Sequence, residues 1–169
     1  MQFVPTDSEF WVAQGIALVC GGLVGLERQL RGKPAGMRTS MLICAGTCLF
    51  VRIGAQLGAG IGSNTDAARV VGQVVTGVGF LGAGVILTRD GLVKGMTSAA
   101  VVWILAAIGS LIGVGRGGEA LAATGVTLAV LVGVNRLERA YRSLRTGVHA
   151  DDSMEEPMSG LPPPVQPRK

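Results

Sequence analysis

Five apolar segments, separated by short charged stretches, limit what this chain of 169 residues can fold into. They cover about residues 10–26, 39–57, 70–87, 97–114 and 120–137, and each is long enough, or nearly so, to cross a bilayer as a helix. A soluble domain of this size rarely leaves so many separate runs with almost no charge. The sequence therefore predicts an all-α integral membrane protein, a bundle of about five transmembrane helices.

Basic residues gather in alternate loops, and this pattern predicts the orientation. Four lie between the first and second segments, Arg89 and Lys94 follow the third, and several arginines follow the fifth. The positive-inside rule places these loops in the cytoplasm, with the N-terminus outside and the C-terminus inside. Because the basic residues flank apolar segments instead of covering a soluble surface, no nucleic-acid partner is expected.

The composition divides the chain into three parts. Residues 1–9 are expected to be an extracytoplasmic segment and residues 10–145 the transmembrane domain. Residues 146–169 are rich in proline and acidic residues, which predicts a disordered cytoplasmic tail. His149, the only histidine, lies in this tail, so no buried histidine is available for a proton relay.

The third segment contains the glycine spacing of a dinucleotide-binding loop, at Gly77, Gly79 and Gly82. That motif requires a preceding strand and an acidic residue about 20 positions later, and the sequence supplies neither. No cofactor is therefore expected. In a membrane, small residues allow helices to approach closely, so these glycines and Gly84 predict a third helix at the centre of the bundle. The alternative is a broken helix that exposes carbonyl groups to an ion.

Polar residues lead into the third segment along one helix face, at Asp66, Arg69, Gln73 and Thr76. They form either a polar entry path or ordinary interhelical hydrogen bonds. No firm metal site emerges, and Asp66 is the candidate ligand for a cation. Arg52, a charge within the second segment, is expected either to pair with Asp66 or to extend its guanidinium to the outer surface.

The three cysteines, Cys20, Cys44 and Cys48, all lie in apolar segments. Cys44 and Cys48 could share a helix face and present thiols to a soft metal, but free cysteine usually behaves as a small buried hydrophobe. The loop after the first segment is more distinctive. Glu27 and Arg38 could pair there, and Thr39 is predicted to cap the second helix.

Three blocks of this sequence resemble the MgtC/SapB family of bacterial inner-membrane proteins, over about residues 10–140. The blocks are Gly25-Leu-Glu-Arg28 with Arg31 through Ala35-Gly-Met-Arg-Thr39, Asp66 and Arg69 leading into Gln73–Gly84, and Val93–Ala100 with Trp103, followed by Ala106-Ala-Ile-Gly109. The resemblance implies functional roles at Glu27, Arg28, Gly36, Arg38, Thr39, Asp66, Arg69, Gln73, Gly79, Gly82, Gly84, Gly95, Thr97 and Trp103. The short tail, in place of the folded cytoplasmic domain of longer members, departs from the pattern.

The resemblance also implies a function in adaptation to low magnesium and, in pathogens, in virulence. On this basis the chain is expected to be a regulator of other membrane proteins, among them the proton-translocating ATP synthase, and could form a homo-oligomer. The alternative is a transporter or channel for magnesium or another cation. An enzyme is not expected, because no serine or cysteine lies beside a recognisable base; Ser98 and Ser110 are better explained as interhelical hydrogen bonders.

Overall fold

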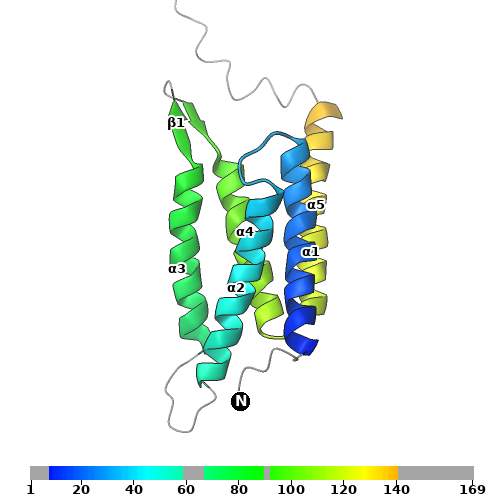
Figure 1. The fold of residues 1–169 in the computed structure, drawn as a ribbon. Coiled ribbons are helices and arrows are strands. Elements are labelled where there is room, and N and C mark those ends of the chain that lie inside the picture. The colour runs from blue at the N-terminus through cyan, green and yellow to red at the C-terminus, as the bar shows by residue number, and fades with distance from the viewer. Residues whose placement is uncertain (1–7, 59–66, 90–91, 141–169) are drawn as a thin grey trace, which may run out of the picture. The chain divides into compact units, whose positions relative to one another are not determined.

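A computed structural model describes residues 8–58, 67–89 and 92–140 (Figure 1). Its elements are α1 (Ser8–Leu30), α2 (Met37–Gly58), α3 (Ala67–Val85), β1 (Leu87–Arg89), β2 (Leu92–Lys94), α4 (Met96–Gly113) and α5 (Gly117–Ala140). The described residues up to Leu131 form one compact unit, and a second unit begins at Val132, within α5. The expected terminal segments, 1–9 and 146–169, lie almost wholly outside the described residues.

The five expected helices are present, and four of them could cross a membrane by length and composition. These four are α1, α2, α4 and α5, whereas the apolar part of α3, Arg69–Val85, is shorter. Most helices extend beyond the predicted bounds, because polar residues continue the helix past each apolar run. The fold is therefore an all-helical, multi-pass membrane architecture.

A small β-hairpin was not predicted, and it shortens the third helix. α3 ends at Val85, two residues before the predicted end, and β1 then pairs with β2 in antiparallel register, with Thr88 opposite Val93. Asp90-Gly91 separates the two strands, and this dipeptide is a strong hairpin signal. The hairpin connects α3 to α4 at one end of the helices (Figure 1).

Glycines hold α2 closely against two neighbours. A Cβ atom at Gly21 of α1 would lie 2.6 Å from the Ser40 carbonyl oxygen, and one at Gly109 of α4 would lie 2.5 Å from the Cys44 carbonyl oxygen. Gly25 and Gly113 make similarly close contacts one turn along their helices. In each helix the two glycines are four residues apart, which is the small-residue spacing expected where membrane helices pack closely.

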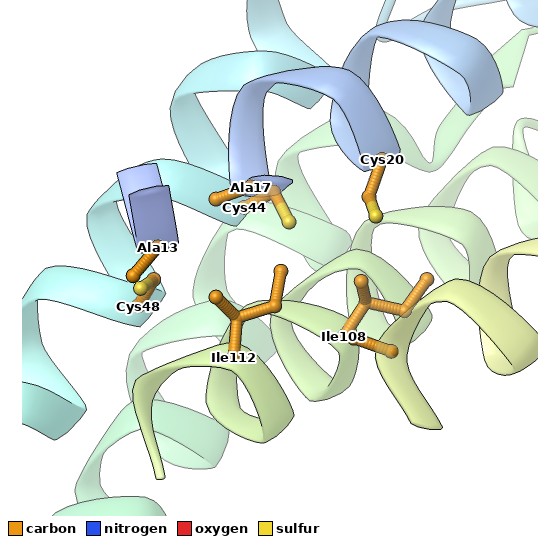
Figure 2. Packing of buried hydrophobic residues seen from close by; sticks show 8 residues of the cluster. Ala13, Ala17, Cys20, Cys44, Cys48, Ile108 and Ile112 are labelled. Carbon is orange, nitrogen blue, oxygen red and sulfur yellow. The ribbon is translucent and has the colours of Figure 1, made fainter. Parts of the chain in front are cut away.

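The buried centre of this packing is apolar and contains all three cysteines. In Figure 2, Cys44 of α2 lies beside Ala17 of α1 and Cys48 lies beside Ala13, while Cys20 of α1 lies nearer Ile108 of α4. The thiols are free and fully buried. They fill a core that small alanine and glycine residues leave narrow, as expected for cysteine acting as a hydrophobe.

The prediction that the third helix occupies the centre is wrong for the described chain. α3 contacts mainly α2 and α4, which each contact two or more further helices. A Cβ atom at Gly77, Gly79 or Gly84 would meet nothing within 4 Å, and one at Gly82 would reach only Ala99, at 3.8 Å. The alternative of a broken helix is also wrong, since α3 is continuous. The glycines of the third segment therefore do not make the close helix contacts that their pattern predicted; such contacts are made by Gly21 and Gly25 of α1 and by Gly109 and Gly113 of α4.

Candidate functional site: a buried charge cluster and an open groove

A cluster of charged side chains is buried at the C-terminal end of α1. Glu27 is 9% exposed and Arg28 is 3% exposed, although both carry charge. The Glu27 carboxylate pairs with Arg31, one turn later, and lies 4.0 Å from Nη1 of Arg28. Charged groups are costly to bury unless they are paired, so these contacts set the conformation of this end of the helix.

Arg28 joins two distant parts of the sequence. Its Nη2 donates a hydrogen bond of 2.7 Å to Oγ of Ser98, 70 residues away in the first turn of α4. Ser98 is therefore an interhelical hydrogen bonder, as predicted. Ser110 is not, because its hydroxyl donates to the Ala106 carbonyl within α4.

The cluster leaves polar atoms without hydrogen bonds. Within the described residues, both Glu27 carboxylate oxygens and Nε of Arg28 are buried without a hydrogen-bond partner. The Glu27–Arg31 contact is therefore an ion pair without good hydrogen-bond geometry. Two guanidinium groups against one carboxylate leave a net charge of about +1 at this end of α1.

The loop after α1 is fixed by hydrogen bonds that were not foreseen. The Arg28 carbonyl accepts from the Lys33 amide at 3.0 Å, and Oε1 of Gln29 accepts from the Met37 amide at 3.3 Å. The second helix consequently begins at Met37. Thr39 lies inside its first turn, so the prediction that Thr39 caps this helix is wrong. Arg38 and Thr39 are both exposed.

Gly95 is required at the junction between β2 and α4, which leads to a stability prediction. Its φ is +96°, and a Cβ atom there would overlap the Val85 carbonyl oxygen. We expect Gly95→Ala to lower the free energy of unfolding in detergent by at least about 2 kcal/mol, because the left-handed backbone and the clash add. Gly84→Ala, with open space around it, should change that energy little or raise it. Equal effects of the two substitutions would contradict this assignment.

The polar residues predicted at the other end are separated from this cluster. Arg52 is half-buried and lines a hollow of about 440 Å³ together with Glu9 and Gly117. Asp66, its predicted partner and the candidate cation ligand, lies outside the described residues. The structure therefore leaves the Arg52–Asp66 pair a prediction.

A groove of about 700 Å³ lies between α2 and α3 and is almost entirely apolar. Gln73 and Gly77 of α3 line one side of it, and Gly46 and Phe50 of α2 line the other. Thr76, on the face predicted to be polar, donates instead to the Gly72 carbonyl of its own helix at 3.1 Å. We call the groove between α2 and α3 the docking groove. Its other lining residues are Thr39, Leu42, Ile43, Thr47, Ile53, Gly54, Val70, Val74, Val78 and Leu81.

The remaining residues of the predicted motif lie on the surface. Arg69 is exposed in the first turn of α3, and Thr97 is exposed in the first turn of α4. Trp103 is 53% exposed and lines a second hollow, of about 400 Å³, between α3 and α4. The structure thus brings Glu27 and Arg28 together with Ser98, and places Thr39 and Gln73 on the docking groove.

The sequence profile of the MgtC family matches residues 15–140, which is most of the described chain. The chain belongs to the MgtC family. "Putative magnesium transporter YhiD" of Escherichia coli strain K12 is 39% identical over 146 residues, covering 84% of this chain and 67% of the relative. Protein SrpB of Synechococcus elongatus is 42% identical over 137 residues, covering 73% of this chain and 74% of the relative.

The namesake of the family is also similar to this chain. Protein MgtC of Salmonella typhi is 36% identical over 135 residues, and the match covers 80% of this chain but only 56% of that relative. No solved structure matches. These three relatives are all bacterial proteins.

The sequence placed Arg31 in a motif and Ser98 among the interhelical hydrogen bonders, but it did not predict that they pair with Glu27 and Arg28, nor that Gly46 lines the docking groove. Arg31 follows Glu27 at a spacing of four, which is the usual spacing of a helical ion pair, so a signal for it was present. No local pattern pairs Arg28 with Ser98, because their contact depends on how α1 and α4 pack.

Proposed function

We propose that this chain is a multi-pass inner-membrane regulator, and that it binds a transmembrane helix of another membrane protein in the docking groove. The observation that carries the proposal is the contrast among its glycines. Gly21 and Gly109 are already in close contact with neighbouring helices, whereas Gly46 and Gly77, on the two sides of the groove, have nothing within 4 Å. Because membrane helices associate through small residues, open glycines on facing walls fit an incoming helix.

Gln73 supports the same proposal. Its amide is exposed, and it lies in a groove lined mainly by aliphatic side chains. A polar side chain that faces lipid is unfavourable, and membrane proteins usually satisfy such a group through a hydrogen bond to another helix. The partner is therefore expected to be an apolar helix with small side chains and one polar group near Gln73.

The biological role we propose follows the family resemblance: adaptation to low magnesium through control of a membrane partner. The proton-translocating ATP synthase is the partner that the resemblance implies. The positive-inside pattern supports an orientation with the hairpin and the buried charge cluster on the cytoplasmic side. No chemical step at this chain is part of the proposal.

Cation transport is the second candidate, because one relative at 39% identity has a name that describes a magnesium transporter. In that case the Asp66 carboxylate would bind the cation at the outer side of the membrane, and Gln73 would line the path of the cation. Mg²⁺ loses its water reluctantly and prefers oxygen ligands from carboxylates, so Asp66→Asn should abolish its flux. The regulatory proposal predicts no magnesium flux into proteoliposomes that contain the folded chain alone.

Filling the groove provides the direct functional test. We expect Gly77→Leu to accumulate normally in the membrane, because nothing lies within 4 Å of that Cβ position, yet to lose the ability to support growth at low magnesium. Gly15→Leu is the matched control, since Gly15 also has open space around it but lies on α1, away from the groove. Normal growth with Gly77→Leu, or equal loss with Gly15→Leu, would contradict a role of the groove.

A further inference from the structure

We infer that the hollow beside Arg52 binds a zwitterion, a ligand with one anionic oxygen group and one ammonium group. We call it the Arg52 hollow, and its volume is about 440 Å³. Unlike the docking groove and the hollow beside Trp103, it has charged side chains of both signs in its lining, those of Arg52 and Glu9. It shares no lining residue with the docking groove, so the inference goes beyond the proposed regulatory function.

The Arg52 hollow lies near the ends of four helices. Glu9 lines it from the first turn of α1, Arg52 from the last two turns of α2, and Gly117 from the start of α5. This is the end of the helices opposite to the β-hairpin (Figure 1). The lining also contains apolar side chains, among them Val12, Ile16 and Ile112. Charged groups therefore lie beside an apolar wall, which is the kind of lining that suits an amphipathic ligand.

Arg52 points to an anionic group in the ligand. Its side chain is half-buried, in a helix that is long and apolar enough to cross a membrane. Among the described residues, Arg52 has no partner in an ion pair or hydrogen bond. A guanidinium that is partly withdrawn from water is unfavourable unless an anion pairs with it. Phosphate and carboxylate groups fit it best, because their oxygens accept two parallel hydrogen bonds.

Glu9 indicates what else the ligand carries. Its side chain is exposed and lines the same hollow as Arg52. Glu9 would repel an anion that has no positive group, and Arg52 would repel a metal cation. Mg²⁺ also prefers several oxygen ligands, and Glu9 is the single carboxylate among the described residues of this lining. A neutral zwitterion matches both charges, with its anionic oxygens on Arg52 and its ammonium group on Glu9.

Two sources supply this chemistry. One is the headgroup of phosphatidylethanolamine, which carries a phosphate and a primary ammonium group. The other is a free zwitterion of the same kind, such as glycerophosphoethanolamine. The hollow lies at the end of candidate membrane spans, and Val12 in its apolar wall is 61% exposed. An exposed apolar wall beside the charges favours the lipid, because the acyl chains then stay in the bilayer while the headgroup enters the hollow.

The test measures the unfolding midpoint of the full purified chain with both sources as probes. Phosphatidylethanolamine is titrated into phosphatidylcholine nanodiscs, and glycerophosphoethanolamine is titrated in detergent at constant ionic strength. We expect phosphatidylethanolamine to stabilise the chain. Phosphatidylglycerol, which has the phosphate but no ammonium group, should stabilise it less at the same mole fraction. The apparent affinity should fall about tenfold or more in Arg52→Gln and in Glu9→Gln, because a charge-assisted hydrogen bond is lost in each.

Two further variants serve as controls. Arg116→Gln removes an arginine that is 60% exposed and does not line the hollow, although its neighbours Gly115 and Gly117 do, and it should bind as the unaltered chain does. Asp66→Asn should bind at least as tightly, because Asp66, the partner predicted for Arg52 from the sequence, would compete with the ligand for that arginine.

Each outcome decides the proposal. Stabilisation by phosphatidylethanolamine alone assigns a lipid headgroup to the hollow, and stabilisation by glycerophosphoethanolamine as well assigns a hollow open to water. No stabilisation by either probe would overturn the proposal, as would equal stabilisation by phosphatidylglycerol. Unchanged affinity in Arg52→Gln would also overturn it and would indicate that the guanidinium only extends to the outer surface. Equal weakening in Arg116→Gln would indicate diffuse charge instead of a site. If Arg52→Gln does not fold, Glu9→Gln decides, since Glu9 is exposed.

Discussion

Gly21→Leu is expected to abolish stable accumulation of this protein in the membrane. A Cβ atom at Gly21 would lie 2.6 Å from the Ser40 carbonyl oxygen and 2.9 Å from Cα of Met41, so it would meet backbone that cannot rotate away. The α1 and α2 helices would have to separate, and their shared core would lose contact. Overpacking typically costs about 1–3 kcal/mol, and a leucine that meets backbone on two sides belongs at or above the upper end of that range.

Gly79→Leu is the matched control for this prediction. It makes the same change in another helix, at a position where a Cβ atom meets nothing within 4 Å. It should accumulate at least as well as the unaltered chain, because leucine favours a helix over glycine by up to about 1 kcal/mol. Quantitative immunoblotting of membrane fractions measures how much of the Gly21→Leu and Gly79→Leu variants accumulates. If Gly21→Leu accumulates normally, or if Gly79→Leu is lost, the packing described for α1 and α2 is wrong.

Glu27→Gln is expected to destabilise the protein by about 3 kcal/mol. The substitution keeps the size of the side chain but leaves Arg28, which is 3% exposed, beside Arg31 without the carboxylate between them. Removing one partner from a buried ion pair is costly because the remaining charge stays buried. Denaturant unfolding in detergent, followed by circular dichroism, measures the free-energy change.

An exposed ion pair in the same chain supplies the comparison. Glu119 pairs with Arg116, and both side chains are more than half exposed, at 52% and 60%. Glu119→Gln should therefore cost less than about 1 kcal/mol. Glu27→Gln combined with Arg31→Gln should recover part of the lost stability, because it removes the excess positive charge. If Glu27→Gln lowers the free energy of unfolding no more than Glu119→Gln does, the buried cluster does not stabilise the protein more than an exposed ion pair.

Local patterns predicted the helices well, since a long apolar run leaves a membrane chain few alternatives. The same reasoning failed at residues 87–94, where the hydropathy of Leu87 was counted as helix although Asp90-Gly91 favours a hairpin. It also failed in assigning the central helix. Glycine spacing shows that a helix can be approached closely, but which helix approaches depends on the packing of the whole chain.

The candidate site was predictable only in part. Glu27 and Arg28 were singled out by the resemblance to the MgtC/SapB family, and no local pattern predicted that both would be buried. Their connection to Ser98 depends on tertiary packing across 70 residues. The docking groove could not be foreseen, because it is defined by the absence of close neighbours around Gly46 and Gly77.

The most direct test of the proposed regulatory function is photo-crosslinking at Phe50, which lines the docking groove and is 64% exposed. A photoactivatable phenylalanine analogue replaces Phe50 in cells grown at low magnesium, and the same analogue at Trp11, an exposed aromatic residue of α1 outside the groove, is the control. The account predicts a crosslink from position 50 to one membrane protein other than this chain, its loss in Gly77→Leu, and no such product from position 11. A crosslink only to lipid or to a second copy, or one that persists in Gly77→Leu, would contradict it.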